Sequence, residues 1–315
     1  MKKLPLSITS FEKIRDPAEN YLYIDKTELA YQLINSGTYY FLSRPRRFGK
    51  SLFIDTLKSL FEGRKDLFQH LAISNKWDWN TVYPVIQVDF NTGDFKSSKT
   101  IENRIYDIFR QIQRDLDVNC ENTNNIPSCF NELIRNIYEK HQQKVVILID
   151  EYDKPILDNI TNKSIALEAR NILKSFYSVI KSNDQYIKFV FITGVSKFSK
   201  MNLFSGLNNL VDITTMSDYA TICGYTHNDV KTHFKEHLKD VDLDKVKSWY
   251  NGYNYYPDCI DCSVYNPFDV LLFIANHYEY SSYWWETGTP SFLIEKLKEQ
   301  NYYIPNLENI IVTKK

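Results

Sequence analysis

Five short apolar runs, separated by longer amphipathic stretches, constrain the fold of this chain more than any other feature of its sequence. Three of them are apolar at consecutive positions, so both of their faces must be buried, which is typical of strands inside a parallel sheet. The runs are rich in Val, Ile, Phe and Tyr, the residues that favour strands. They are YYFLS (39–43), YPVIQVDF (83–90), KVVILID (144–150), KFVFITG (188–194) and LVDIT (210–214).

Helical patterns occupy the intervals between these runs. In the first interval, at 49–62, Phe53, Leu57 and Leu60 recur at helical spacing, and Gly63 can end the helix in the left-handed conformation. An alternation of strands and helices predicts an α/β fold, a parallel sheet flanked by helices. The other helical stretches of this part are 99–117, 128–141 and 164–182.

The sequence changes character after residue 216, where helical patterns replace the strand-like runs. We therefore expect an α/β domain at 1–216 and a smaller, mainly helical domain at 217–315. Thr289 and Pro290 suit the N-cap and the first turn of the last helix. The predicted helices are 226–238, 241–250, 267–277 and 290–299.

The charge balance excludes one broad class of function. The chain has 315 residues, with 38 Lys and Arg against 39 Asp and Glu. A protein that coats nucleic acid by charge alone would be basic overall. Any concentration of positive charge in this chain is therefore a local feature with a local purpose.

The apolar runs and the cysteines bear on location. No apolar run approaches the roughly 20 residues of a membrane helix, and the start of the chain lacks the apolar segment of a secretory signal. The five cysteines are scattered and odd in number; Cys259 and Cys262 form a single CxxC, whereas zinc takes about four ligands. The sequence predicts ordinary thiols in a reducing, cytoplasmic protein that does not contact a membrane.

One cluster of basic residues stands out, in FLSRPRRFGKSLF (41–53), between the first strand and the first helix. A helix N-terminus offers free backbone N–H groups and the positive end of its dipole to an anion. Gly49 would let the backbone approach a phosphate, Lys50 would reach the β and γ oxygens, and Ser51 would place its hydroxyl on Mg²⁺. The turn predicts a P-loop, with Arg44 at the position of the first glycine of that motif; the alternative is a solvated basic loop.

Two carboxylates end the third apolar run. Asp150 and Glu151 follow KVVILI directly, about 100 residues after Lys50. A buried charge is costly unless it is paired. In P-loop proteins, such a strand lies beside the P-loop strand; its first acid holds Mg²⁺ and its second polarises the attacking water. A strand that simply reaches the surface at Asp150 is the alternative, but with the turn above the pair predicts a nucleoside-triphosphate site.

A third run ends in small polar residues, FVFITGVSKFSK (189–200). Thr193 or Ser196 could sense the γ-phosphate or orient water there, and an ordinary strand end explains each residue equally well. Arg46 or Arg47 could contact the nucleotide of this chain or of a neighbouring subunit. These alternatives stay open at the level of sequence.

Nearly the whole chain resembles AAA-ATPase-like proteins of the P-loop NTPase superfamily, which usually carry a C-terminal PD-(D/E)xK nuclease-like domain. The matching stretches are YLYIDKTELAYQLI (21–34), SRPRRFGKSLFIDTL (43–57), WDWNTVYPVIQVDF (77–90), LIDEYDKPI (148–156), FITGVSKFSKMNLFSGLNNLVDIT (191–214), YATICGYT (219–226), WYNGY (249–253) and YWWETGTPSFL (283–293).

The resemblance implies a set of site residues. An arginine in place of the first P-loop glycine belongs to the family pattern, and the turn and the acid pair match its Walker A and Walker B elements. Lys50 and Glu151 are the predicted catalytic residues, and Ser51 and Asp150 the predicted Mg²⁺ ligands. The residues predicted to bind ATP are Arg44, Arg46, Arg47, Phe48, Gly49, Lys50, Ser51, Leu52, Thr193 and Ser196.

The sequence thus predicts Mg²⁺-dependent ATP binding and hydrolysis. The alternative is a nucleotide-gated binding module with a DNA or protein partner, in which hydrolysis is incidental; a homo-oligomer is compatible with both. The lack of a guanine-reading N/T-K-x-D motif favours ATP over GTP. No Asp…Glu-x-Lys set stands at a strand end in 217–315, so we expect the nuclease domain of the family to be absent. The aromatic stretches 249–258 and 280–286 are expected to pack rather than to stack on bases.

Overall fold

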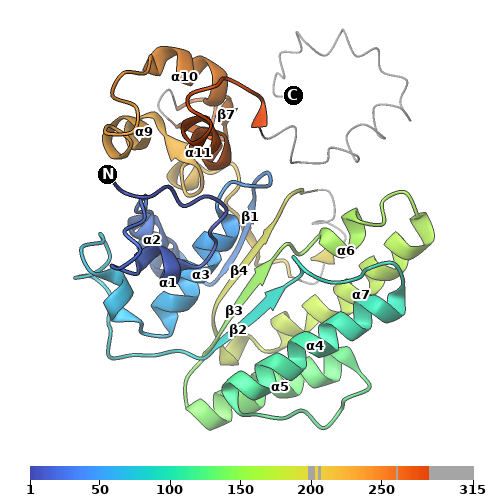
Figure 1. Cartoon of the computed structure of the whole chain (residues 1–315). Coiled ribbons are helices and arrows are strands. Elements are labelled where there is room, and N and C mark those ends of the chain that lie inside the picture. The colour runs from blue at the N-terminus through green and yellow to red at the C-terminus, as the bar shows by residue number, and fades with distance from the viewer. Residues whose placement is uncertain (198–202, 205–206, 260–261, 284–315) are drawn as a thin grey trace.

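The computed structural model of the protein describes residues 1–197, 203–204, 207–259 and 262–283. A five-stranded sheet, parallel at every pairing, runs through the centre in the order β2-β3-β4-β1-β5 (Figure 1). All five predicted strands are confirmed, although the second and the last are each three residues shorter than predicted. The strands are β1 (Tyr39–Ser43), β2 (Val85–Asp89), β3 (Val145–Asp150), β4 (Ile187–Gly194) and β5 (Val211–Asp212).

Helices cover both faces of this sheet. Phe41 and Ile147 pack with α4, α5 and α7 on one face, whereas Leu42 and Leu148 pack with α2 and α3 on the other. Neighbouring residues of one strand thus enter different cores, which explains why the runs are apolar at consecutive positions. The helices are α1 (Phe11–Arg15), α2 (Thr27–Ser36), α3 (Lys50–Phe61), α4 (Ser98–Leu116), α5 (Ile126–His141), α6 (Lys154–Leu157) and α7 (Lys163–Ser182), with single 3₁₀ turns at Lys65–Phe68, Asp184–Tyr186 and Ser217–Tyr219.

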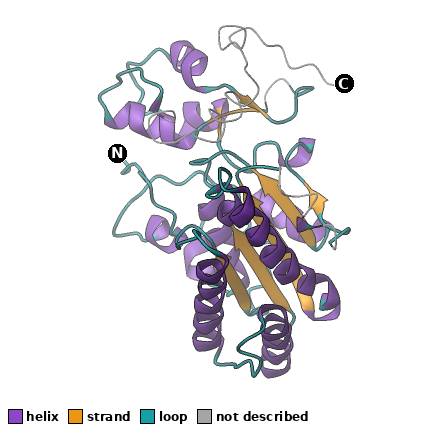
Figure 2. Ribbon diagram, turned by 90° about the vertical axis from the view of Figure 1, so that its right-hand side faces the viewer, coloured by secondary structure: helices purple, strands orange, loops and turns teal. Residues whose placement is uncertain are grey.

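The C-terminal part lies at one end of the main sheet (Figure 2) and holds both helices and strands. Three predicted helices are confirmed in shorter form, and the fourth, 290–299, lies outside the described residues. A small antiparallel sheet in the order β6-β8-β7 was not predicted, because strands of two or three residues are too short to display an alternating pattern. The elements are β6 (Tyr225–Thr226), α9 (His227–His233), α10 (Leu243–Tyr250), β7 (Tyr253–Asn254), β8 (Ser263–Tyr265) and α11 (Pro267–Ala275).

The two parts share apolar cores. Leu22 and Ile24, near the start of the chain, pack among the helices of the C-terminal part. Conversely, Ile222 and Val264 pack in the cluster that contains α3. The turn between β1 and α3 is therefore enclosed by segments from both ends of the chain. No helix in the described ranges is long and apolar enough to cross a membrane.

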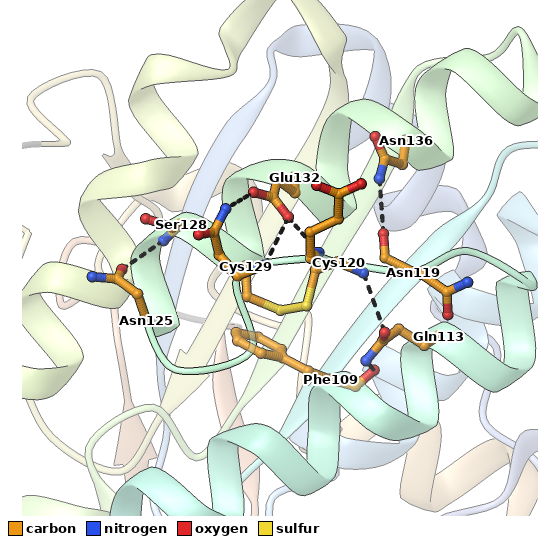
Figure 3. The surroundings of a disulfide bond; sticks show 11 residues. Phe109, Gln113, Asn119, Cys120, Asn125, Ser128, Cys129, Glu132 and Asn136 are labelled. Atoms are coloured by element: carbon orange, nitrogen blue, oxygen red, sulfur yellow. Dashed lines mark hydrogen bonds between the residues drawn. A yellow bond between two sulfur atoms is a disulfide. The ribbon is translucent and has the colours of Figure 1, made fainter.

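The prediction of ordinary thiols is wrong for four of the five cysteines. Cys120, in the loop after α4, is bonded to Cys129 in the first turn of α5 (Figure 3), and Cys259 is bonded to Cys262. Their Cα atoms lie 5.2 and 5.4 Å apart, within the usual range for a disulfide. Cys120 and Cys129 are nine residues apart in the sequence, and only the fold brings them together. Disulfides are typical of oxidising surroundings, so the cysteines do not support the predicted cytoplasmic location. Cys223 is free and buried.

Candidate functional site

A cavity of about 790 Å³ opens at the carboxyl ends of the central strands. The turn between β1 and α3 forms its floor, and the ends of β2 and β3 form one side. The other walls come from residues near the start of the chain, such as Ile8, and from the C-terminal part, such as Tyr225 and Phe268. Three segments that are far apart in sequence thus enclose one space.

The turn ends in a geometry that favours anions. Gly49 is the N-cap of α3 and has φ +90°, a left-handed conformation that non-glycine residues rarely adopt. A Cβ atom at this position would meet nothing within 4 Å, so the backbone angle and not a lack of space requires glycine. The first N–H groups of α3 have no partners within the helix and can bind an anion in the cavity.

Lys50 lines the cavity, although its side chain is only 3% exposed. Its Nζ lies 3.2 Å from the carbonyl oxygen of Pro45 and 3.2 Å from Oε1 of Glu151. Burial raises the pKa of Glu151, and the positive charge of Lys50 opposes that rise. Glu151 also has a left-handed backbone, with φ +53°, which is uncommon for a residue other than glycine.

The N-terminus of α3 and the ends of β4 and β2 converge on the carboxylate of Asp150. The Ser51 hydroxyl donates to its Oδ2 at 2.5 Å, and the Thr193 hydroxyl donates to its Oδ1 at 2.5 Å. The Nδ2 of Asn91, beyond the end of β2, is 3.2 Å from Oδ2. The structure therefore brings Ser51, Asp150 and Thr193 together. The expectation that the strand of the acid pair lies directly beside the strand before the turn is wrong, because β4 lies between β3 and β1.

Two residues of this site escaped the sequence interpretation. Asn91 contacts Asp150, and Asp89 is the β2 residue in register with it; both line the cavity. Burial raises the pKa of Asp89, and the nearby charge of Asp150 adds to that rise. The sequence held a usable signal, because Asp89 ends an apolar run as Asp150 does.

The arginines of the turn divide into two groups. Arg46 and Arg47 are exposed and line the cavity, as does Leu52. The Arg47 guanidinium lies 4.6 Å from the centre of the Phe268 ring, at the start of α11. Phe48 contributes to the lining, but its ring packs 4.7 Å from that of Tyr253.

Arg44 does not join the others. It is 1% exposed, and its guanidinium donates to the carbonyl oxygens of Ser43, Thr214, Tyr219 and Ala220. The ring of Tyr255 lies 3.6 Å from its Cζ, and burial lowers its pKa. In this structure Arg44 ties the turn to the C-terminal part and does not line the cavity, which also gives the aromatic stretch at 249–258 a packing role.

Ser196 is also directed away from the cavity. Its hydroxyl donates to Oδ2 of Asp153 at 3.0 Å, and its N–H does the same. Burial raises the pKa of Asp153, and these bonds oppose the rise. Of the two residues suggested for the end of β4, the structure places Thr193 at Asp150 and Ser196 at Asp153.

The donor set suits Mg²⁺ only together with phosphate oxygens. Among the described residues, no cluster of three or more His, Cys, Asp or Glu side chains is arranged to hold a metal ion. Ser51 and Asp150 provide one hydroxyl and one carboxylate that already touch. Mg²⁺ usually binds through one or two carboxylates and the phosphates of a substrate, so these residues fit such an ion.

Comparisons with known proteins agree with this geometry. Residues 5–204 match the family model described as predicted AAA-ATPase. An uncharacterized protein in the vnfD 5′ region of Azotobacter chroococcum mcd 1 is 46% identical over 312 residues, 99% of this chain and 59% of that protein. This chain thus spans about three fifths of the length of that relative.

A solved structure of the Aeropyrum pernix ORC2 protein, in ADPNP and ADP complexes, aligns with 95% of this chain and 74% of its own, at a TM-score of 0.41 and 11% identity. That likeness is too distant to support an argument. The family match covers more than half of the chain and includes the turn and the acid pair. The chain belongs to the predicted AAA-ATPase family.

Proposed function

We propose that this protein binds ATP with Mg²⁺ and hydrolyses it. One observation supports the proposal above all others: the Ser51 hydroxyl lies 2.5 Å from the Asp150 carboxylate, at the N-terminus of α3 and beside Lys50. A hydroxyl, a carboxylate and a lysine at a helix N-terminus are the groups that a nucleoside triphosphate with Mg²⁺ requires.

Each residue has a separate task in this proposal. The N–H groups of α3 and the Lys50 ammonium bind the phosphates, and Ser51 and Asp150 hold the metal ion. Bound Mg²⁺ neutralises negative charge on the phosphate oxygens. Thr193 orients Asp150 through the bond that they share. Glu151 polarises the attacking water as a general base.

The ion pair of Lys50 with Glu151 suggests how binding prepares the site. At 3.2 Å, each is the charged partner of the other within the cavity. A phosphate that approaches the turn competes for the Lys50 ammonium. Glu151 then loses its cation and becomes free to accept a proton from water.

The walls of the cavity fit the rest of a nucleotide. Ile8, Ile222 and Leu271 line it together with Phe268. An apolar wall of this kind can cover a purine and a ribose, while the polar floor binds the phosphates. ATP over GTP remains the expectation from sequence.

The test is a comparison of ATP and GTP, in Mg²⁺ and in EDTA. We expect saturable ATP binding and a turnover that EDTA abolishes. Binding that is indifferent to Mg²⁺, or no binding of either nucleotide, would reject the proposal. The Lys50→Ala variant is the control for contaminating ATPases.

A second function is supported by a different observation. The C-terminal part forms a wall of the cavity, and Arg47 of the turn contacts Phe268 of that wall. A bound nucleotide would therefore touch both parts, as in a nucleotide-gated module for a DNA or protein partner. ATP binding without measurable turnover, together with a changed protease sensitivity of the C-terminal part, would favour this function.

A further inference from the structure

The loop after β3 contains a third acid that the proposed reaction does not use. Asp153 is completely buried. One carboxylate oxygen accepts the Val195 N–H at 3.3 Å, and the other accepts the N–H and the hydroxyl of Ser196, both at 3.0 Å. Among the described residues, no lysine or arginine forms an ion pair with Asp153, and the bonds that oppose the rise of its pKa come from Val195 and Ser196 and from its own backbone. A buried carboxylate without a cation is costly, so these three bonds must offset that cost.

The loop after β3 packs closely against the end of β4 around Asp153. A Cβ atom on Gly194 would lie 2.4 Å from the ring of Tyr152 and 2.6 Å from Oδ1 of Asp153. The Tyr152 hydroxyl also donates to the carbonyl oxygen of Ser196 at 2.9 Å. Contacts with the loop after β3 therefore help to fix the path of residues 194–196, together with hydrogen bonds from Ser43 and Arg44 to the carbonyl oxygens of Val195 and Gly194.

That path controls a group at the metal site. Thr193 immediately precedes Gly194, and its hydroxyl donates to Oδ1 of Asp150 at 2.5 Å. Ser51 holds the other oxygen of the same carboxylate. A shift of residues 194–196 would move Thr193 and release one of the two hydroxyl groups that orient Asp150.

We propose that Asp153 is a positioning residue for the metal site: by holding residues 195 and 196, it keeps the Thr193 hydroxyl on Asp150 and so fixes the Asp150 carboxylate toward Mg²⁺. Asp153 itself touches neither metal nor nucleotide. The inference rests on the proposed function, because it assigns a residue to the Mg²⁺ site of that function. Partners that orient metal ligands commonly change metal affinity by about 10- to 100-fold when they are lost.

The experiment uses Asp153→Asn, which keeps the size of the side chain but turns one acceptor into an N–H donor facing other donors. A fluorescent N-methylanthraniloyl-ATP is bound to the full chain and Mg²⁺ is titrated. Mn²⁺ is then substituted and its electron paramagnetic resonance spectrum recorded. We expect a half-saturating Mg²⁺ concentration about tenfold higher, a changed Mn²⁺ spectrum, and unchanged affinity for the analogue in EDTA.

Two further variants separate positioning from loss of stability. Ser196→Ala removes one of the three hydrogen bonds to Asp153 and should raise the half-saturating Mg²⁺ concentration by about threefold. This variant also tests the proposal if Asp153→Asn does not fold. Asn159→Ala is the matched control, because its buried side chain donates to the carbonyl oxygens of Phe95 and Pro155 and does not reach residues 195–196. It should lower the melting temperature and leave the Mg²⁺ titration unchanged.

The outcomes are distinct. An Asp153→Asn protein with the Mg²⁺ dependence of the parent would overturn this inference alone. So would an equal loss of analogue affinity with and without Mg²⁺, which is what a merely structural role predicts. A parent protein that binds neither Mg²⁺ nor the analogue would overturn the proposed function, and this inference with it.

Discussion

Two sets of charged side chains surround the turn between β1 and α3, and they are satisfied in different ways. The inner set, Arg44 and Asp153, is bonded mainly to the backbone: Arg44 to four carbonyl oxygens, and Asp153 to two N–H groups and one hydroxyl. The cavity set, Lys50, Asp150 and Glu151, is bonded mainly to other side chains.

The difference teaches which charges are available to a ligand. Backbone partners are fixed by the fold, so the inner set cannot exchange them without local unfolding. Side-chain partners can rotate away, so Lys50 can exchange Glu151 for a phosphate. Burial alone does not separate the sets, because Arg44 and Lys50 are 1% and 3% exposed.

The largest expected effect tests the cavity set. Glu151→Gln should leave ATP affinity within about twofold and lower turnover by about a thousandfold, because the amide cannot accept a proton from water. Single-turnover hydrolysis and nucleotide binding are measured on the same preparation. Turnover equal to that of the parent would withdraw the role of general base and favour the nucleotide-gated module.

The next effect tests the inner set. Arg44→Ala should lower the free energy of unfolding by about 3 kcal/mol, because it leaves buried carbonyl oxygens without donors and opens space beside Tyr255. Urea denaturation measures the change, and Arg46→Ala, at an exposed position of the same turn, is the matched control. If Arg44→Ala weakened ATP binding without lowering stability, Arg44 would belong with the cavity set.

Lys50→Ala should show the opposite pattern to Arg44→Ala. ATP affinity should fall by about a hundredfold, which corresponds to about 2.7 kcal/mol, because the phosphates lose their nearest cation. The protein should remain folded by circular dichroism. Unchanged ATP affinity in a folded Lys50→Ala protein would remove the P-loop role from this lysine.

The smallest expected effect concerns Tyr255, whose ring packs against Arg44 of the inner set. The ring of Tyr255 lies 3.6 Å from the Arg44 guanidinium, and a cation–π contact at a buried site contributes about 1–2 kcal/mol. Tyr255→Leu should reduce stability by about 1 kcal/mol and leave ATP affinity unchanged. In a protein that already carries Arg44→Ala, Tyr255→Leu should lower the free energy of unfolding by a smaller amount. An equal decrease with and without Arg44 would argue against the cation–π contact between the two residues.

Most of the main sheet could be predicted, because its signal is local. The run at 145–149 is apolar at every position, and in the structure Ile147 and Leu148 enter cores on opposite faces of the sheet. The small sheet could not be predicted in this way, since β6 and β7 have two residues each. The disulfide between Cys120 and Cys129 could not be predicted either, because the two cysteines meet only when the loop between α4 and α5 is folded.

The sequence by itself determined the order of strands and helices, the turn that ends in Gly49-Lys50-Ser51, and the acids that follow β3, since each depends on residues adjacent in the chain. The tertiary structure decided which of two similar groups lies at the site: Thr193, which contacts Asp150, and not Ser196; Lys50, which lines the cavity, and not Arg44. The physical reason is distance along the chain. Arg44 finds three of its four carbonyl partners 170 to 176 residues away, and Thr193 finds Asp150 across 43 residues. Only the packed sheet brings such groups within hydrogen-bonding range.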